Sequence, residues 1–90
     1  MIQPFSDEQI KRQQEFFNRA RKGVLKYLND KGGVLNMTEL HDYSMNTFFI
    51  QHQGFSRMME TFVNEALVTY DAQSQDTFIT ESGKKFVESP

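Results

Sequence analysis

A row of polar side chains on one predicted helix is the feature of this sequence best suited to chemistry. Residues 53–65 carry apolar residues at helical spacing, which predicts an amphipathic helix. Its outward face should hold Gln53, Ser56, Arg57, Glu60, Thr61 and Asn64. All of these except Glu60 belong to residue types that can hydrogen-bond to base edges in a major groove. Arg57 is the only cation in the row, and Glu60 offsets its charge.

The positive charge that phosphate contacts require lies in another part of the sequence. Residues 11–31 hold seven basic and two acidic residues, a formal charge of +5, whereas residues 32–90 have a formal charge of −5. Lys22 and Lys26 share a basic stripe of the first predicted helix with Lys11, Arg12 and Arg19. This stripe is either a source of phosphate contacts or simply a solvated helix face. The net charge of −2 argues mildly against a nucleic acid partner.

The residue types that enzymes and metal centres need are absent or isolated in this sequence. There is no cysteine, so we expect no disulfide, no thiolate zinc site and no cysteine nucleophile. His41 and His52 are eleven residues apart on different predicted elements, and neither has a partner at metal-ligand spacing. Ser56 has no nucleophile elbow around it. The sequence therefore predicts a protein that is not an enzyme and that has no cofactor or metal.

Length and composition predict one domain over residues 1–90. Ninety residues are near the lower size for a core without staples, and nine Phe supply large apolar side chains. The sequence has no basic-then-apolar leader and no long apolar run. We therefore expect a soluble, cytoplasmic protein.

The start of the first helix carries several signals. Ser6 is a good N-cap residue, and Gln9 is placed to complete a capping box. Phe5 and Ile10 are placed for a hydrophobic staple. The helix is predicted to run to about Leu28, where two glycines follow and stop it.

The two halves of this first helix differ in their apolar content. Six residues form one apolar arc: Phe16, Phe17, Ala20, Val24, Tyr27 and Leu28. Residues 11–14 add almost nothing to it. We therefore expect residues 1–14 to project beyond the core and to meet a second copy of the chain, which predicts a homodimer.

A short strand over residues 33–35 and a second helix are predicted next. Asn36 should cap that helix with Glu39 completing a capping box, and Leu40 and Tyr43 should be buried. The register of residues 44–54 is ambiguous. The third helix is placed near residues 53–65, with this buried stripe: Phe55, Met58, Met59, Phe62, Val63 and Ala66.

Two short strands and a final helix complete the predicted elements. Residues 67–70 and 77–80 have strand-forming side chains, and the polar run 71–76 joins them. We expect six residues to meet in one core: Phe16, Leu28, Leu40, Phe62, Leu67 and Phe86.

Residues 33–86 resemble a winged helix-turn-helix of the kind found in MarR-type and PadR-type regulators and in small archaeal or viral DNA-binding proteins. The resemblance lies in Ser56-Arg57 early in the third helix and in Ala66-Leu67-Val68 before the wing. It also lies in Ile79-Thr80-Glu81-Ser82-Gly83-Lys84-Lys85-Phe86, which is similar to the families' Leu-Thr-Glu-x-Gly-x-x-Phe. The turn between the second and third helices is predicted to be about four residues longer than in these families. The wing tip 71–76 has two acids and no Lys or Arg.

The resemblance implies an α+β, mostly helical winged helix-turn-helix with a long N-terminal helix, a two-stranded wing and a short C-terminal helix. It also implies a transcriptional regulator that binds double-stranded DNA as a homodimer through the helix near residues 53–65. The expected DNA contacts are Gln53, Ser56, Arg57, Thr61, Asn64, Lys22 and Lys26. The alternative is a protein–protein interaction module without DNA binding, which docks through its acidic half or through Phe48-Phe49-Ile50.

Overall fold

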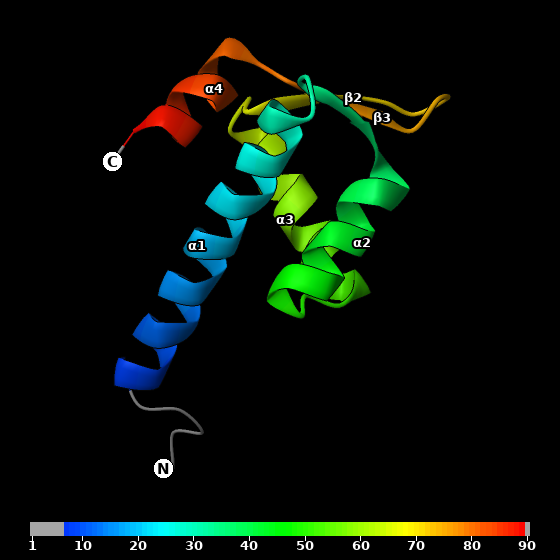
Figure 1. Ribbon diagram of the computed structural model, residues 1–90. Coiled ribbons are helices and arrows are strands. Elements are labelled where there is room, and N and C mark those ends of the chain that lie inside the picture. Colours follow the sequence, from blue (N-terminus) through cyan, green and yellow to red (C-terminus); the bar gives the residue numbers. More distant parts are fainter. Residues whose placement is uncertain (1–6, 90) are drawn as a thin grey trace.

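The computed structural model describes residues 7–89, and in this part of the chain the fold is α+β and mostly helical (Figure 1). The elements are α1 (Asp7–Asp30), β1 (Val34–Asn36), α2 (Met37–Phe48), α3 (His52–Asn64), β2 (Val68–Asp71), β3 (Asp76–Ile79) and α4 (Glu81–Glu88). The fold class predicted from the sequence, a long first helix with a hairpin and a short last helix, is confirmed at this level. Phe5 and Ser6 lie outside the described residues, and so do the N-cap and staple predicted there.

The three strands form one antiparallel sheet in the order β1-β3-β2. Val34 pairs with Phe78 across β1 and β3, and Val68 pairs with Ile79 across β2 and β3. β2 begins one residue later than predicted, because the Leu67 N–H donates to the Phe62 carbonyl oxygen at the end of α3. The hairpin therefore follows α3 directly.

Two glycines end α1, as predicted. Gly32 and Gly33 have φ angles of 101° and 88°, in the left-handed region where glycine is favoured. The Gly33 N–H donates to the Leu28 carbonyl oxygen at 2.9 Å. The helix itself continues to Asp30, two residues beyond the predicted end.

Asn36 ends β1 and caps α2. Its side-chain oxygen accepts a hydrogen bond from the Thr38 N–H at 2.9 Å, which confirms the predicted cap. The Glu39 carboxylate accepts a hydrogen bond from the Tyr27 hydroxyl at 3.3 Å, and Tyr27 stacks on Tyr43 with ring centroids 3.8 Å apart. Burial, and then the nearby Glu39 charge, raise the pKa of Tyr27 above its ordinary value, so the phenol stays protonated as the donor.

The connection between α2 and α3 is short, so the long turn expected from the sequence is wrong. α2 extends through the ambiguous stretch to Phe48, and only residues 49–51 precede α3. Phe49 ends α2 in the left-handed conformation with φ of 58°, and its N–H donates to the Met45 carbonyl oxygen at 3.0 Å. For a residue other than glycine this conformation costs about 1–2 kcal/mol.

The core lies where the second half of α1 meets α2, α3 and the sheet. Its buried residues are Ala20, Val24, Leu25, Leu28, Leu40, Ile50, Phe55, Met58, Met59, Phe62, Leu67 and Val68. This confirms burial of four predicted core residues: Leu28, Leu40, Phe62 and Leu67. Phe86 packs against the core and is half-buried.

Three residues predicted to be buried are exposed instead. Phe16 is 47% exposed, because it precedes the segment of α1 that the other elements cover. Val63 is 48% exposed, on the side of α3 that borders a groove. Ala66 lies beyond the end of α3 with φ of 58° and is exposed, so the apolar stripe stops at Phe62.

Arg21 is a buried cation that could not be recognised as buried from the sequence. Its side chain is 10% exposed, and one guanidinium nitrogen lies 2.7 Å from Glu65 Oε2. The guanidinium carbon is 5.6 Å from the ring centroids of both Phe62 and Phe86. Arg21 therefore joins α1 to the end of α3 and to α4.

Gly23 and Gly83 mark two close approaches between elements. A Cβ on Gly23 would lie 2.4 Å from the Phe48 ring, so the end of α2 rests directly on α1. A Cβ on Gly83 would lie 2.2 Å from the Leu67 carbonyl oxygen, so α4 contacts the backbone before β2. Thr80 caps α4 by accepting a hydrogen bond from the Gly83 N–H at 3.0 Å.

We expect Phe62→Ala to lower the free energy of unfolding by about 3–5 kcal/mol, because it removes a large ring from a packed core. Denaturant unfolding followed by circular dichroism measures this change. Phe78→Thr, at a 40% exposed strand position, is the control and should cost less than about 1 kcal/mol. Equal losses in the two variants would contradict the assignment of Phe62 to the core.

We expect Glu65→Ala to lower the free energy of unfolding by about 1–3 kcal/mol, because it leaves the Arg21 guanidinium buried without its carboxylate. Glu65 is itself 50% exposed, which keeps the loss below that of a fully buried pair. In an Arg21→Met background the same change should cost much less, since no buried charge is left unpaired. A double-mutant cycle by denaturant unfolding measures the difference. Equal costs in both backgrounds would show that the pair is not coupled.

Candidate functional site

The outward face of α3 is polar and exposed. Gln53, Arg57 and Asn64 lie within a narrow arc on the side opposite Phe62, at about 100° per residue. Glu60 borders the same arc. Among residues 7–89, none of these four polar side chains forms a hydrogen bond or an ion pair. They are therefore available to another molecule.

Ser56 and Thr61 flank this arc instead of lying on it. Ser56 is exposed and lines a groove beside α3. Thr61 is half-buried, and its hydroxyl donates to the Met58 carbonyl oxygen at 2.7 Å. The Thr61 hydroxyl is thus directed at its own helix and does not join the outward row.

Arg57 lies beside the first half of α1. It is the one α3 residue that lines a hollow of about 640 Å³, and the other lining residues belong to α1: Ile10, Gln13, Gln14, Phe17 and Asn18. Of the predicted contact residues on α3, Arg57 is thus the one directed toward α1, whereas Ser56 faces the opposite side.

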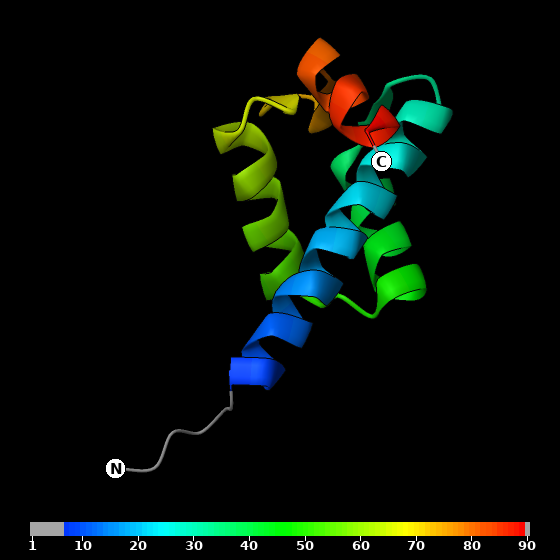
Figure 2. The same cartoon turned by 90° about the vertical axis from the view of Figure 1, so that its left-hand side faces the viewer.

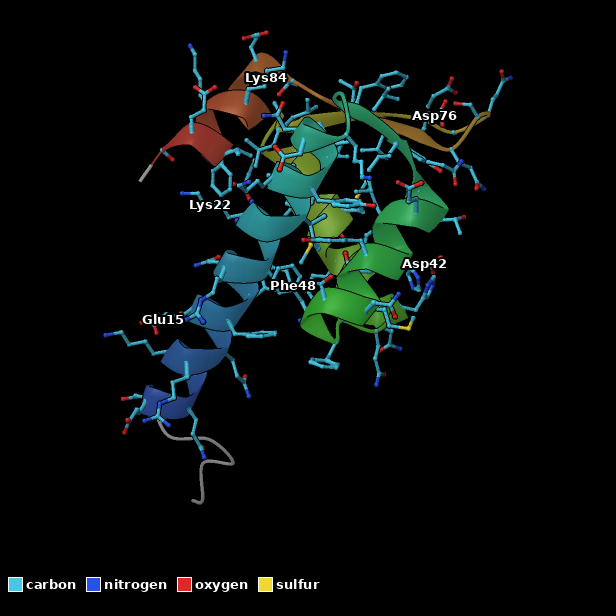
Figure 3. All side chains as sticks on the ribbon, in the orientation of Figure 1. Glu15, Lys22, Asp42, Phe48, Asp76 and Lys84 are labelled. Carbon is cyan, nitrogen blue, oxygen red and sulfur yellow. The ribbon has the colours of Figure 1, made fainter. Side chains whose placement is uncertain are left out.

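Lys22 and Lys26 are not brought next to the outward face of α3. Lys22 Nζ donates to the Ser89 carbonyl oxygen, and Lys26 Nζ lies 3.0 Å from Asp30 Oδ2. In Figure 3, Lys22 projects from the left of α1 beneath α4. Both lysines stand away from the buried side of α1, whereas Arg21 faces α3. The structure therefore divides the predicted DNA contacts between two surfaces.

A groove of about 630 Å³ runs along the other side of α3, between α2, α3 and β2. Its apolar lining consists of Met37, Phe55, Met59, Val63 and Tyr70. Phe55 and Met59 are buried at its base, whereas Val63 and Tyr70 are 48% and 40% exposed at its edges. Ser56, Glu60 and Asn64 add polar groups from α3. Apolar clefts of this size with a few polar groups are typical of binding sites.

Two histidines meet at the α2 side of this groove. The rings of His41 and His52 have centroids 5.6 Å apart, and the His41 ring lies edge-on to Phe55 at 5.2 Å. His41 Nδ1 is 3.7 Å from Asp42 Oδ1, while its Nε2 is buried without a hydrogen-bond partner. From the sequence we treated the two histidines as unrelated residues, whereas the fold brings their rings together. No group of three or more His, Cys, Asp or Glu in residues 7–89 could hold a metal ion.

The stretch of sequence that supplies the groove is acidic. Residues 32–83 include α2, α3 and the hairpin, and they hold seven acidic residues and one basic residue, Arg57, a formal charge of −6. Asp71 and Asp76 pair across the end of the hairpin, and Figure 3 shows Asp76 there. Of the seven acids only Glu60 lines the groove, whereas Glu65 is paired with Arg21 and Glu81 with Lys84.

Sequence reasoning found the outward row of α3 but missed the groove and the histidine pair. Periodicity identifies which residues share a helix face, whereas a groove depends on the distance between two helices and a strand. The helical position of Val63 carried a usable signal, because at about 100° per residue it lies beside Ser56 and away from Phe62.

Among residues 7–89, no helix combines the length and the apolar character needed to cross a membrane. Comparison with known proteins finds no matching family model, no matching curated protein and no matching solved structure.

Proposed function

We propose that this chain is a winged helix-turn-helix interaction module that binds a cationic amphipathic helix of a partner protein in the groove beside α3. One observation carries the proposal: the groove is apolar, and its only carboxylate or Lys/Arg side chain is Glu60. An apolar lining selects apolar side chains, and the Glu60 carboxylate favours positive charge beside them.

The order of the elements supports the winged-helix assignment. A helix and a short strand precede α2 and α3, which are joined by residues 49–51, and a hairpin follows. β1 pairs with the second strand of that hairpin, which gives the sheet order β1-β3-β2. In a DNA-binding helix-turn-helix, the helix in the position of α3 is the one that lies in the major groove.

The shape of the groove supports a helical partner. Its walls come from α2 and α3, and an amphipathic helix lays its apolar face into a groove of this kind. Met37 and Met59 contribute flexible side chains that adjust to different apolar shapes. Val63 and Tyr70 at the edges are exposed, so a bound helix would remove apolar surface from water.

Electrostatics favour a protein over DNA at this surface. Binding to DNA depends mainly on neutralising phosphates with Lys and Arg. Arg57 is the only such residue between Lys31 and Lys84, in a region of formal charge −6. Charges on α1 that lie more than about 8 Å away are largely screened at physiological salt.

Duplex DNA is the second candidate, and the outward row of α3 favours it. Gln53, Arg57 and Asn64 are exposed, unpaired within residues 7–89, and spaced at one and then two helical turns. These residue types can bind base edges in a major groove. In this case the chain would act as a DNA-binding regulator, and Lys22 and Lys26 would have to supply phosphate contacts from α1.

The first test uses a synthetic amphipathic helix of Leu and Lys, about 14 residues and 20 Å long, with a Leu and Glu peptide as its counterpart. We expect the Lys peptide to shift the backbone NMR signals of groove residues, and the Glu peptide to bind much more weakly. Val63→Ser should weaken binding about tenfold, because it removes about 1.5 kcal/mol of apolar contact. Val34→Ser is the matched control, because Val34 is 41% exposed on β1 and does not line the groove. Signal shifts elsewhere, or equal binding of the two peptides, would contradict the proposal.

The second test titrates labelled duplex DNA across a salt series by fluorescence anisotropy. We expect no measurable binding near physiological salt. If α3 does bind base edges of DNA, Arg57→Ala should weaken binding to the preferred site by about 1–3 kcal/mol. It should also reduce the sequence preference at one base position. Replacing Lys22 and Lys26 with Ala should then weaken all sequences alike and flatten the salt slope by about one unit per lost phosphate contact. Binding that depends on Arg57 in this way would establish the second candidate in place of the first.

A further inference from the structure

The histidine pair, His41 and His52, lies at one end of the groove beside α3. Both residues line the groove, His41 from the second turn of α2 and His52 from the start of α3. Figure 2 shows α3 running from the turn after α2 toward the strands, so the pair marks the turn end of the groove. Glu60 follows His52 by eight residues on α3, about 12 Å along the helix axis. The groove thus has two histidines at one end and its carboxylate about two helical turns away.

The two rings differ in their surroundings. His52 is exposed, and within residues 7–89 it forms no hydrogen bond or ion pair. The His41 side chain is 21% exposed, and its Nδ1 lies 3.7 Å from Asp42 Oδ1, a contact that becomes an ion pair when the ring is protonated. His41 Nε2 has no hydrogen-bond partner in the described residues. No hydrogen bond in this part of the chain therefore fixes the protonation of either ring.

Histidine is the side chain whose charge ordinarily changes between pH 8 and pH 5.5. His41 and His52 are the only histidines of the chain. Among the other residues that line the groove, Glu60 is the one carboxylate and Tyr70 the one phenol, and no Lys or Arg is present. Carboxylates and phenols ordinarily keep their charge state over this range. Acidification therefore adds positive charge to the groove, and it adds it at the histidine end.

Charged groups beyond the lining are engaged or face other surfaces. Asp42 stands beside His41 and does not line the groove. The Glu39 carboxylate, on the same helix, accepts a hydrogen bond from α1. Arg57 lines the hollow on the α1 side of α3. The charge that a partner meets in the groove is thus set by Glu60 and the histidine pair.

We propose that the histidine pair makes binding in the groove pH-dependent, so that a basic helix is held at pH 8 and released on acidification. This inference rests on the proposed function, since it concerns the same groove. With both rings neutral, Glu60 gives the lining a formal charge of −1, and with both rings protonated the lining has a formal charge of +1. Asp42 next to His41 offsets part of the added charge. The attraction for cations at pH 8 is therefore lost at pH 5.5.

The length of the groove explains why a bound helix responds to both ends. A helix of about 14 residues is about 20 Å long, and His52 and Glu60 are about 12 Å apart along α3. A helix that lies along the groove thus passes both groups, and basic residues spread along it cannot all stay near Glu60. Charges within about 8 Å of one another are not fully screened at physiological salt. The buried Phe55 ring beside His41 adds apolar surroundings, in which charges interact more strongly than in water.

Two peptides at two pH values test the inference: the Leu and Lys helix used above and a Leu and Gln helix of the same length, both with blocked ends. The Gln peptide reports apolar contact alone, so the ratio of the two dissociation constants measures the preference for positive charge. Fluorescence anisotropy with labelled peptides gives both constants at pH 8 and at pH 5.5. We expect the Lys peptide to bind more tightly than the Gln peptide at pH 8. We expect this preference to fall about fivefold or more at pH 5.5.

Substitution of the histidines identifies the groups responsible. In the variant with both His41→Gln and His52→Gln, the preference should be the same at the two pH values. His52→Gln alone changes an exposed residue and should keep only part of the fall, so it carries the test even if the double variant does not fold. Glu60→Gln is the matched control, because it should lower the preference at pH 8 yet leave the fall on acidification. Circular dichroism melting curves at each pH show whether each variant is folded.

The possible outcomes separate this inference from the proposed function. Binding of the Lys peptide in the groove at pH 8, with an unchanged preference at pH 5.5, would overturn the inference and leave the proposed function intact. An equal fall in the natural chain and in the histidine variants would also overturn it, because other groups would then be responsible. No binding of the Lys peptide at pH 8 would contradict the proposed function, and the inference with it.

Discussion

The buried guanidinium of Arg21 is the constraint on which the arrangement of the helices depends. A cation with a 10% exposed side chain is tolerated only where opposite charge and aromatic faces surround it. Glu65 supplies the charge from the end of α3, Phe62 supplies a ring from α3, and Phe86 supplies a ring from α4. These contacts fix the direction of α3 relative to α1. Since α3 lines both the groove and the hollow, its direction contributes to the geometry of each.

Local signals in the sequence predict the elements well, because each element depends on neighbours a few residues away. Asn36 caps α2 and Gly32 helps to end α1, as their chemistry requires. Phe16 and Val63 were wrongly expected to be buried, because periodicity describes a helix face and not the length of the neighbour that covers it. The groove could not be predicted for the same reason. Its walls come from α2, α3 and β2, which come together only in the folded protein. Arg21 went unnoticed because a buried Arg is recognisable only through its partners.

Charge is distributed unevenly between α1 and the rest of the chain. α1 holds most of the basic residues. Some of them pair with acids of the same helix, as Lys26 does with Asp30. Residues 32–83 have a formal charge of −6, and Glu60 is the one carboxylate that lines the groove. α3 itself carries one cation, Arg57, and one carboxylate, Glu60, so its own side chains have no net formal charge. The fold alone therefore does not decide what α3 binds.

Two residues of this chain are unusual for the positions that they occupy, and both are exposed to solvent. Phe49 has a left-handed backbone and an exposed ring, and Val63 interrupts the polar side of α3 beside the groove. Neither choice stabilises the isolated fold, since Asn at the first site and a polar residue at the second would suit the free surface better. Sequences that agree with their fold elsewhere usually break such rules where they bind something. Phe49 does not line the groove that Val63 borders, so the two residues mark different surfaces of the molecule.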